Sequence, residues 1–135
     1  MIVVDASVLA NAIGDDGNDG HRVREELRAA GELSAPDLVD VETVAVLRKH
    51  WLAGTLSDER FFAAITDLGE LYLDRYPALP LMRRAYELRA NVTAYDAAYI
   101  ALAEILDCEL LTGDRRLASA PGIRCPIRIV SPERP

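Results

Sequence analysis

The chain has 135 residues, with 15 Lys and Arg against 22 Asp and Glu, so its formal net charge is −7. Hydrophobic residues make up 50% of the sequence and charged residues 27%, which is the composition of a folded domain and excludes a disordered chain. The acidity also argues against loose, non-specific binding to nucleic acid or to anionic membranes.

The hydrophobic pattern predicts strands that alternate with helices. It begins with Ile2–Val4, a β-branched run typical of a strand buried on both faces. The predicted strands cover residues 2–4, 33–35, 71–73, 109–112 and 127–130. The predicted helices cover residues 6–12, 21–30, 37–52, 58–68, 79–89 and 94–106. This order indicates an α/β fold with three layers, α/β/α, around a mostly parallel central sheet.

The length and the absence of a Gly- or Ser-rich linker indicate a single domain over residues 1–131, with a frayed tail at 132–135. No apolar run approaches the ~20 residues that span a bilayer. The first residues lack the basic segment of a signal peptide. Cys108 and Cys125 are too few for a disulfide framework. We therefore expect a cytoplasmic protein without a membrane partner.

Two acids follow predicted strands. Asp5 comes directly after Ile2–Val4, and Asp114 follows the predicted strand at 109–112. Ligands of parallel α/β sheets bind beyond the carboxyl ends of the strands, so both acids are candidate site residues. Each also has a structural explanation, Asp5 as the N-cap of the next helix and Asp114 as a cap or turn residue.

Two more acids lie on predicted helices. Glu42 is flanked at helical spacing by apolar residues between Leu38 and Val46, so it faces the core or a cleft. A carboxylate there needs a partner, and a buried ion pair with an arginine is the structural alternative. Asp96 follows Thr93 at the spacing of a capping box, which is its own structural alternative.

If these four carboxylates share one edge of the sheet, they repel one another unless a cation neutralises them. Ligands that are all oxygen suit Mg²⁺ or Mn²⁺. Zinc is a poor fit, because the two histidines and two cysteines lack ligand spacing. The chemistry typical of such a site is hydrolysis or transfer at a phosphodiester by a metal-activated water.

Taken together, the segments around these acids resemble a PIN domain. The resemblance covers essentially the whole chain and is closest to the VapC toxins of bacterial VapBC toxin–antitoxin pairs. It rests on the order Asp, Glu, Asp, Asp within the segments Val3–Ser7, Asp40–Val44, Tyr95–Ala103 and Leu111–Leu117.

The resemblance implies an endoribonuclease toxin that needs Mg²⁺ or Mn²⁺ and hydrolyses RNA phosphodiester bonds. The family's catalytic and metal-binding acids correspond to Asp5, Glu42, Asp96 and Asp114. The family's hydroxyl residue before the last acid corresponds to Thr112, which we expect to orient the carboxylates, and Ser7 stands where the family often has a small polar residue. Family toxins usually form homodimers and are neutralised by a small VapB-like antitoxin that inserts a segment into the active-site groove.

Arginine supplies 14 of the 15 basic side chains, and its guanidinium suits phosphate oxygens. Arg115 and Arg116 directly follow Asp114 and are the best placed to contact the RNA backbone, although a solvated face is an equal alternative. The aromatic residues, among them Trp51 and Tyr99, are interpreted as core or dimer residues in preference to base-stacking platforms.

Two other functions fit parts of the pattern. The first is a non-catalytic PIN-like module that binds a protein partner, against which the retention of all four acids argues. The second is a receiver-type domain that accepts phosphate on a strand-end Asp. Receivers need a pair of acids after the first strand and a later strand-end Lys, whereas here Asp5 stands alone and Lys49 lies within a predicted helix.

Overall fold

The computed structural model describes residues 1–130, and within them the strands form one parallel sheet. The sheet has five strands in the order β3-β2-β1-β4-β5, and every pair of neighbours is parallel. The strands are β1 (Ile2–Val4), β2 (Leu33–Pro36), β3 (Asp74–Tyr76), β4 (Glu109–Thr112) and β5 (Ile127–Ile129). The three-layer α/β prediction is confirmed, and the mostly parallel sheet is wholly parallel in this part of the chain.

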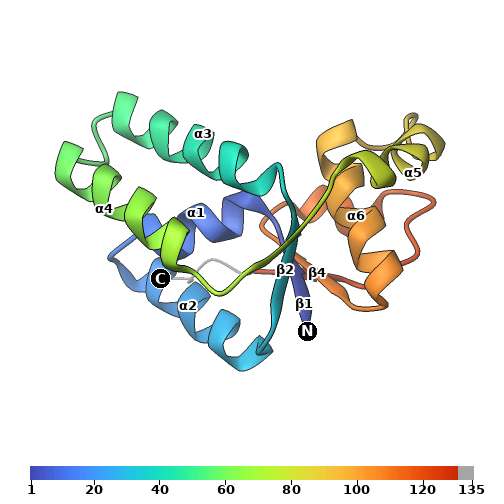
Figure 1. Ribbon diagram of the computed structural model, residues 1–135, viewed down its shortest axis with the longest axis horizontal. Coiled ribbons are helices and arrows are strands. Elements are labelled where there is room, and N and C mark those ends of the chain that lie inside the picture. The colour runs from blue at the N-terminus through green and yellow to red at the C-terminus, as the bar shows by residue number, and fades with distance from the viewer. Residues whose placement is uncertain (131–135) are drawn as a thin grey trace.

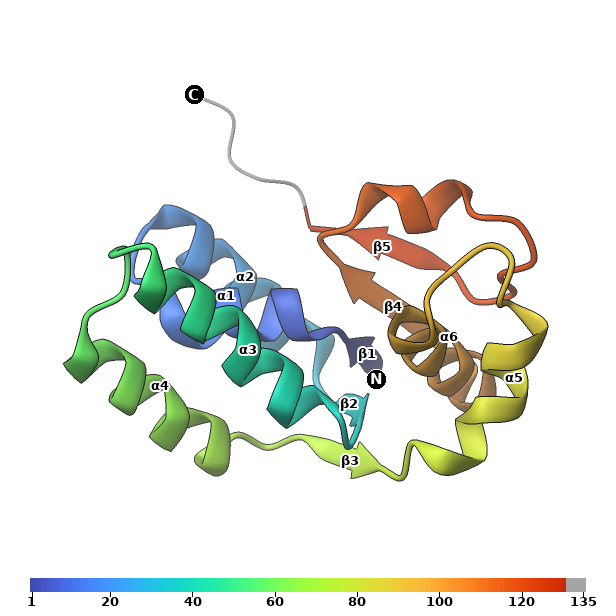
Figure 2. The same ribbon diagram turned by 90° about the horizontal axis from the view of Figure 1, so that it is seen from above.

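Helices cover both faces of the sheet (Figures 1 and 2). One face carries α1 (Ala6–Gly14), α2 (Asn18–Ala30), α3 (Val39–Leu52) and α4 (Asp58–Glu70). The other face carries α5 (Met82–Glu87) and α6 (Ala94–Leu106). Two short 3₁₀ helices, η1 (Leu79–Leu81) and η2 (Arg115–Ser119), complete the described elements.

The first strand is buried on both faces, as its sequence predicts. Ile2 and Val4 join the apolar cluster beneath α1 and α2, whereas Val3 joins the larger cluster that contains α6. Successive side chains of a strand point to opposite faces, so this alternation follows from the strand geometry. Because β1 is central in the sheet, the residue that follows it lies at the middle of the carboxyl edge.

Side-chain caps set several helix starts. Asp5, Ser57 and Thr93 each accept a hydrogen bond from a backbone N–H of the first turn, which begins α1, α4 and α6. The capping explanations for Asp5 and Thr93 are therefore confirmed. They coexist with the site described below, because a capping carboxylate at a strand end remains at the carboxyl edge of the sheet.

The bounds of several predicted helices shift by two or three residues, and two predicted elements are wrong. The apolar run Leu71–Leu73 is not a strand; β3 begins at Asp74, and Tyr72 is 97% exposed. At a sheet edge, pairing with β2 defines the strand more than hydrophobicity does. The helix expected at 79–89 is divided into η1 and the short α5, which ends at Glu87. A 3₁₀ turn is common at the start of an α-helix, and Pro80 lies in its first turn, where no backbone N–H is needed.

The predicted end of the domain at 131 and the tail at 132–135 lie outside the described residues. Within residues 1–130, none of the helices combines the length and apolar character needed to cross a bilayer.

Candidate active site

Asp5 and Thr112 meet at the carboxyl edge of the sheet. β1 and β4 are neighbours with Val4 opposite Leu111, so the residues that follow each are brought together. The Thr112 hydroxyl donates a short hydrogen bond to Oδ2 of Asp5 and accepts one from the Asp114 backbone N–H at 3.0 Å. Thr112 is completely buried, so its hydroxyl holds both acids from within the core.

The other oxygen of the Asp5 carboxylate is also held. Oδ1 accepts hydrogen bonds from the Ser7 hydroxyl at 2.8 Å and from the Val8 backbone N–H at 3.0 Å. Burial nevertheless raises the pKa of Asp5, and these hydrogen bonds, with that from Thr112, only partly oppose the rise. Asp5 is therefore oriented by several donors, which offset only part of its desolvation.

Glu42, in the first turn of α3, is half-buried and finds its partner on the opposite layer of the fold. The Tyr99 hydroxyl of α6 donates a hydrogen bond of 2.6 Å to Oε1 of Glu42. The partner of Glu42 is thus a hydroxyl, and the alternative prediction of a buried ion pair with an arginine is wrong. Burial raises the pKa of Glu42, and the negative charges of Asp96 and Asp5 raise it further, against the lowering effect of the Tyr99 bond.

Asp96 lies in the first turn of α6, where its backbone N–H donates to the Thr93 hydroxyl at 3.1 Å. Burial is the main cause that raises the pKa of the Asp96 carboxyl, followed by the charge of Asp114. The charge of Asp5 contributes as well, while Thr93 and Arg116 lower the pKa. Asp96 therefore lies within electrostatic reach of both strand-end acids.

Asp114 differs from the other three acids because an arginine neutralises it. It is the N-cap of η2, and the backbone N–H of Arg116 donates to its Oδ1 at 3.0 Å. The guanidinium of the same arginine also binds both carboxylate oxygens, and this pairing lowers the pKa of Asp114. Arg115 is exposed on the same turn.

The four predicted acids are thus brought to one edge of the sheet, from β1, α3, α6 and the turn after β4. The charges of Asp5 and Asp96 raise the pKa of Glu42, and those of Asp114 and Asp5 raise the pKa of Asp96, so these carboxylates lie within electrostatic reach of one another. Such repulsion is relieved by a bound cation, and the donors are hard oxygens that suit Mg²⁺ or Mn²⁺.

The carboxylates do not form a closed metal cage. Among residues 1–130, no three His, Cys, Asp or Glu side chains are grouped tightly enough to enclose an ion. Mg²⁺ is usually held by one or two carboxylates and keeps several waters, so an open edge lined by acids fits it better than it would fit zinc.

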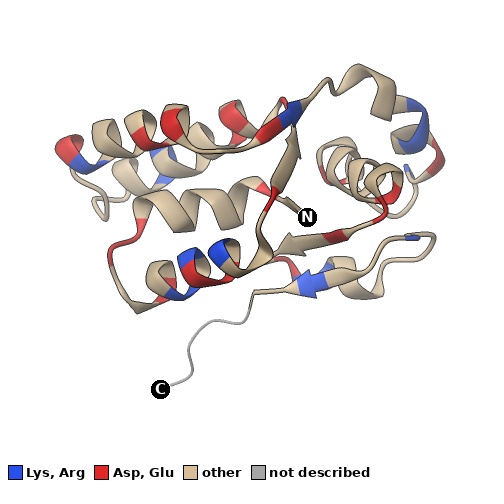
Figure 3. Cartoon of the chain, turned by 60° about the horizontal axis from the view of Figure 1, so that its bottom comes forward, with Lys and Arg blue, Asp and Glu red and all other residues tan. Residues whose placement is uncertain are grey.

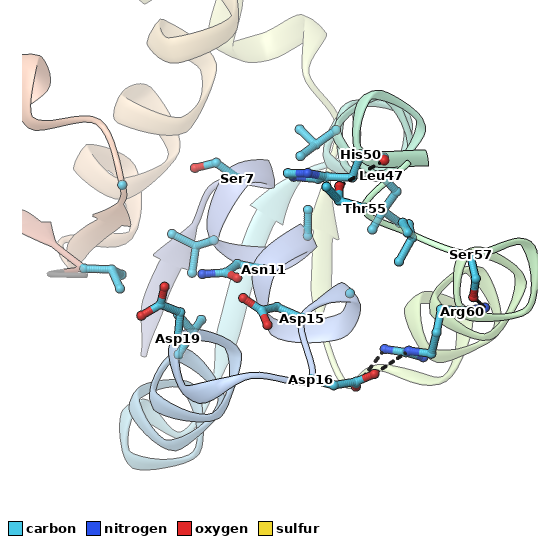
Figure 4. A pocket seen from close by; sticks show the side chains of 18 residues that line it. Ser7, Asn11, Asp15, Asp16, Asp19, Leu47, His50, Thr55, Ser57 and Arg60 are labelled. Atoms are coloured by element: carbon cyan, nitrogen blue, oxygen red, sulfur yellow. Dashed lines mark hydrogen bonds and ion pairs between the residues drawn. The ribbon is translucent and has the colours of Figure 1, made fainter. Parts of the chain in front are cut away.

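A pocket adjoins this edge, and Ser7 and Gly113 are among the residues that line it; Figure 4 shows Ser7 on α1 with other lining side chains. Residues of α1, α2, α3 and the start of α4 line it, and three of the lining residues are acids, Asp15, Asp16 and Asp19. Arg60 of α4 crosses toward Asp16 and binds its carboxylate at 2.8 and 3.1 Å. These three acids lie beyond the far end of α1 from Asp5, and the pocket connects them with Ser7 and Gly113 near the candidate site.

Basic side chains are dispersed over the fold. In Figure 3, Lys and Arg positions on α2, α5 and β5 are interspersed with Asp and Glu. Arg116 is 89% exposed at its side chain but bound to Asp114, so the prediction that it contacts RNA remains open, as does that for Arg115.

Tyr99 is the site residue that sequence reasoning missed. The sequence groups it with core aromatics, and it is indeed 3% exposed. A phenol buried on an apolar helix face needs a hydrogen-bond partner, and Tyr99 is spaced three residues after Asp96 on the same helix. Those two facts are the signal in the sequence that places its hydroxyl near an acid.

Comparison with known proteins identifies the family of this chain. The PIN-domain family model matches residues 2–123. Ribonuclease VapC1 of Mycobacterium tuberculosis is 43% identical over 129 residues, which cover 95% of this chain and 96% of the relative. Its level of identity and its coverage place the two chains in one family.

Solved structures show the same fold at low identity. The sarcin-ricin loop cleaving toxin VapC20 of M. tuberculosis matches with a TM-score of 0.65 and 17% identity, over 92% of this chain and 99% of that chain. VapBC2 of Rickettsia felis, bound to a DNA fragment from its promoter, matches with a TM-score of 0.65 and 14% identity, over 96% and 98%. This chain belongs to the PIN-domain family, within its VapC group.

Proposed function

We propose that this protein is an endoribonuclease toxin that hydrolyses RNA phosphodiester bonds with Mg²⁺ or Mn²⁺ and is neutralised by a cognate antitoxin. One observation carries the proposal: acids from four separate elements converge on the carboxyl edge of the sheet, where three of them have raised pKa values. Desolvated, mutually repelling carboxylates are costly unless they serve a function or bind a cation.

The metal would take its one or two protein ligands from the carboxylates of Asp5, Glu42, Asp96 and Asp114. When bound, it would supply activation of water and neutralisation of charge at the scissile phosphate. The role of the other side chains at the site is to orient these carboxylates. Thr112 and Ser7 fix the Asp5 carboxylate, while the Thr112 hydroxyl also positions the backbone before Asp114.

RNA recognition must overcome the acidic surface. The charge of −7 weakens non-specific attraction to a polyanion, so binding depends on the metal at the acidic edge and on a shaped RNA target. Arg115 and Arg116 border that edge and are the candidate contacts to phosphate.

The same acidity favours a basic partner. The pocket beside the site is lined by Asp15, Asp16 and Asp19, and a VapB-like antitoxin segment with Arg or Lys side chains would complement them. VapBC2 of R. felis, which was solved with a DNA fragment from its promoter, has the same fold. The homodimer implied by the family resemblance stays a prediction.

Growth arrest in bacteria tests the proposal. Inducible expression of the wild-type chain is expected to stop growth and produce RNA fragments with defined ends, and coexpression with the VapB-like protein should restore growth. Asp5→Asn and Asp96→Asn are expected to abolish both effects.

Asp67→Asn is the matched control, because Asp67 is an exposed acid on α4 and should remain as toxic as the wild type. If the wild-type protein is expressed and folded but cuts no RNA, the proposal is wrong and the non-catalytic module becomes the better interpretation.

A further inference from the structure

We propose that Tyr99 is a positioning residue of this site, whose hydroxyl holds the Glu42 carboxylate of α3 beside Asp5 and Asp96. The inference rests on the proposed function, since it assigns Tyr99 a role in assembling that site. It concerns a residue that touches neither RNA nor metal and acts only through Glu42.

The need for such a contact follows from the layers of the fold. α3 packs against α1 and α4 on one face of the sheet, whereas α6 packs against β1, β2 and β4 on the other (Figures 1 and 2). Glu42 and Asp96 therefore come from helices on opposite layers. The Tyr99–Glu42 hydrogen bond of 2.6 Å joins the two layers around the carboxyl edge of the sheet.

Repulsion would otherwise move Glu42 away. Its carboxylate lies within electrostatic reach of Asp96 and Asp5, and the residue is only partly buried, so its side chain can turn toward water. Among the side chains of residues 1–130, it is the Tyr99 hydroxyl that donates a hydrogen bond to this carboxylate. A hydrogen bond to an ionised acceptor is about twice as strong as a neutral one, which opposes the repulsion.

Tyr99 itself is held firmly. It is 3% exposed and belongs to the main apolar cluster, between Ala98 and Ile100, which are completely buried. Because the ring is packed in the core, it cannot move toward solvent, and the position of its hydroxyl is fixed. The same helix presents Asp96 one turn earlier, and α6 thereby sets the positions of two acids, one directly and one through Tyr99.

The variant Tyr99→Phe removes the hydroxyl and keeps the ring that packs in the core. We expect Mn²⁺ affinity, measured by calorimetry without RNA, to fall about 10- to 100-fold, as is typical when the partner of a metal-binding side chain is lost. The rate constant for RNA cleavage should fall with it, while the KM for RNA stays close to that of the wild type.

Tyr72→Phe is the matched control, because Tyr72 is 97% exposed, and it should behave as the wild type in both assays. In a Glu42→Gln background, Tyr99→Phe should cause little further loss, since the two residues act as one unit. If Tyr99→Phe lowers Mn²⁺ affinity and cleavage in the Glu42→Gln protein as much as in the wild type, Tyr99 has a general structural role and the inference is wrong.

A crystal structure of Tyr99→Phe separates this inference from the proposed function. We expect the Glu42 carboxylate to turn away from Asp96, with the aromatic ring of the substituted side chain unmoved. A Glu42 carboxylate in its original place refutes the positioning role, whether or not the wild-type protein cuts RNA. Failure of the wild type to cleave RNA with any divalent cation refutes the proposed function and leaves this structural test intact.

Discussion

The Arg116 guanidinium binds Asp114 through both of its carboxylate oxygens, with Nε 3.0 Å from Oδ1 and Nη2 2.9 Å from Oδ2. Asp114 is consequently the one acid of the four whose pKa is lowered, and the pairing with Arg116 is the main cause. A candidate metal ligand is therefore already neutralised by a positive group of its own chain.

Removing this arginine should favour metal binding. Because the guanidinium and a divalent cation compete for the same carboxylate, Arg116→Gln is expected to raise Mn²⁺ affinity by a few-fold, as measured by calorimetry without RNA. The Arg116 side chain is largely exposed, so screening by solvent limits the effect. Arg115→Gln, one position earlier and also exposed, is the control and should leave Mn²⁺ affinity unchanged. Equal affinity in the Arg116→Gln and wild-type proteins would contradict the competition.

The raised pKa values predict how metal-free stability depends on pH. Folding raises the pKa values of Asp5, Glu42 and Asp96, so their ionised forms lower the free energy of unfolding. This loss of stability is complete at pH values above the pKa values of the folded state. It falls as pH drops through these values and is gone below the ordinary pKa of about 4. Asp114 acts in the opposite sense, since its lowered pKa stabilises the fold above its ordinary pKa and this contribution is lost as pH falls through the folded value.

Thermal unfolding in the presence of a chelator should measure the loss of stability that these ionised carboxylates cause. At neutral pH the variant Asp5→Asn is expected to melt at or above the temperature of the wild type, and the difference should narrow at mildly acidic pH. Saturating Mg²⁺ should reverse the order, because a ligand at 100 times its Kd stabilises the native state by about 2.7 kcal/mol. A variant that is less stable than the wild type in chelator at every pH would refute this loss of stability.

Thr112 and Thr43 offer a matched pair of buried hydroxyls. Both residues are completely buried, but the Thr112 hydroxyl binds Asp5 and the Asp114 N–H, whereas that of Thr43 has no hydrogen-bond partner within residues 1–130. Thr112→Val should therefore lower RNA cleavage about 10- to 100-fold. Thr43→Val should leave cleavage unchanged and stabilise the fold by about 1 kcal/mol, because it removes an unsatisfied polar group. Equal activities of the two variants would show that Thr112 does not orient the site.

A second prediction about stability concerns the face opposite the pocket. Arg84 of α5 binds both carboxylate oxygens of Glu104 on α6 at 2.8 and 3.1 Å and donates to the Gly122 carbonyl. Burial raises the pKa of Glu104, but Arg84 and the Arg124 N–H lower it more, so the net shift is downward. Arg84→Met should lower the free energy of unfolding by about 3 kcal/mol, since it leaves the mostly buried Glu104 carboxylate without its ion-pair partner.

The pH dependence of that loss follows from the sign of the shift. The contribution of Glu104 is present above its ordinary pKa and is lost as pH falls through its lowered folded pKa. Denaturant unfolding at neutral and acidic pH should therefore show a smaller effect of Arg84→Met in acid. A constant difference across that range would contradict the assignment to this ion pair.

Local chemistry is what made the fold predictable. β1 can be recognised from three consecutive β-branched residues, and the helix starts at residues 6, 58 and 94 follow from Asp5, Ser57 and Thr93. These signals act within a few residues of the chain. β3 could not be placed in this way, because its pairing with β2 joins residues far apart in sequence.

The same distinction holds at the candidate site. The order of Asp5, Glu42, Asp96 and Asp114 in their segments is enough to nominate them. Their partners were not predictable, since the Tyr99–Glu42 bond spans 57 positions and depends on the packing of two layers. Arg116 lies only two residues from Asp114, but which way its side chain turns is decided by η2, an element absent from the predictions.

RNA cleavage by the purified wild type and Asp5→Asn, measured in Mg²⁺, in Mn²⁺ and in chelator, tests the central claim most directly. We predict defined fragments from the wild type with either cation, none in chelator, and a loss of at least about 100-fold in Asp5→Asn, while both proteins melt cooperatively. Cleavage that persists in chelator, or an Asp5→Asn protein that cuts RNA as fast as the wild type, would contradict a metal-dependent site built on these acids.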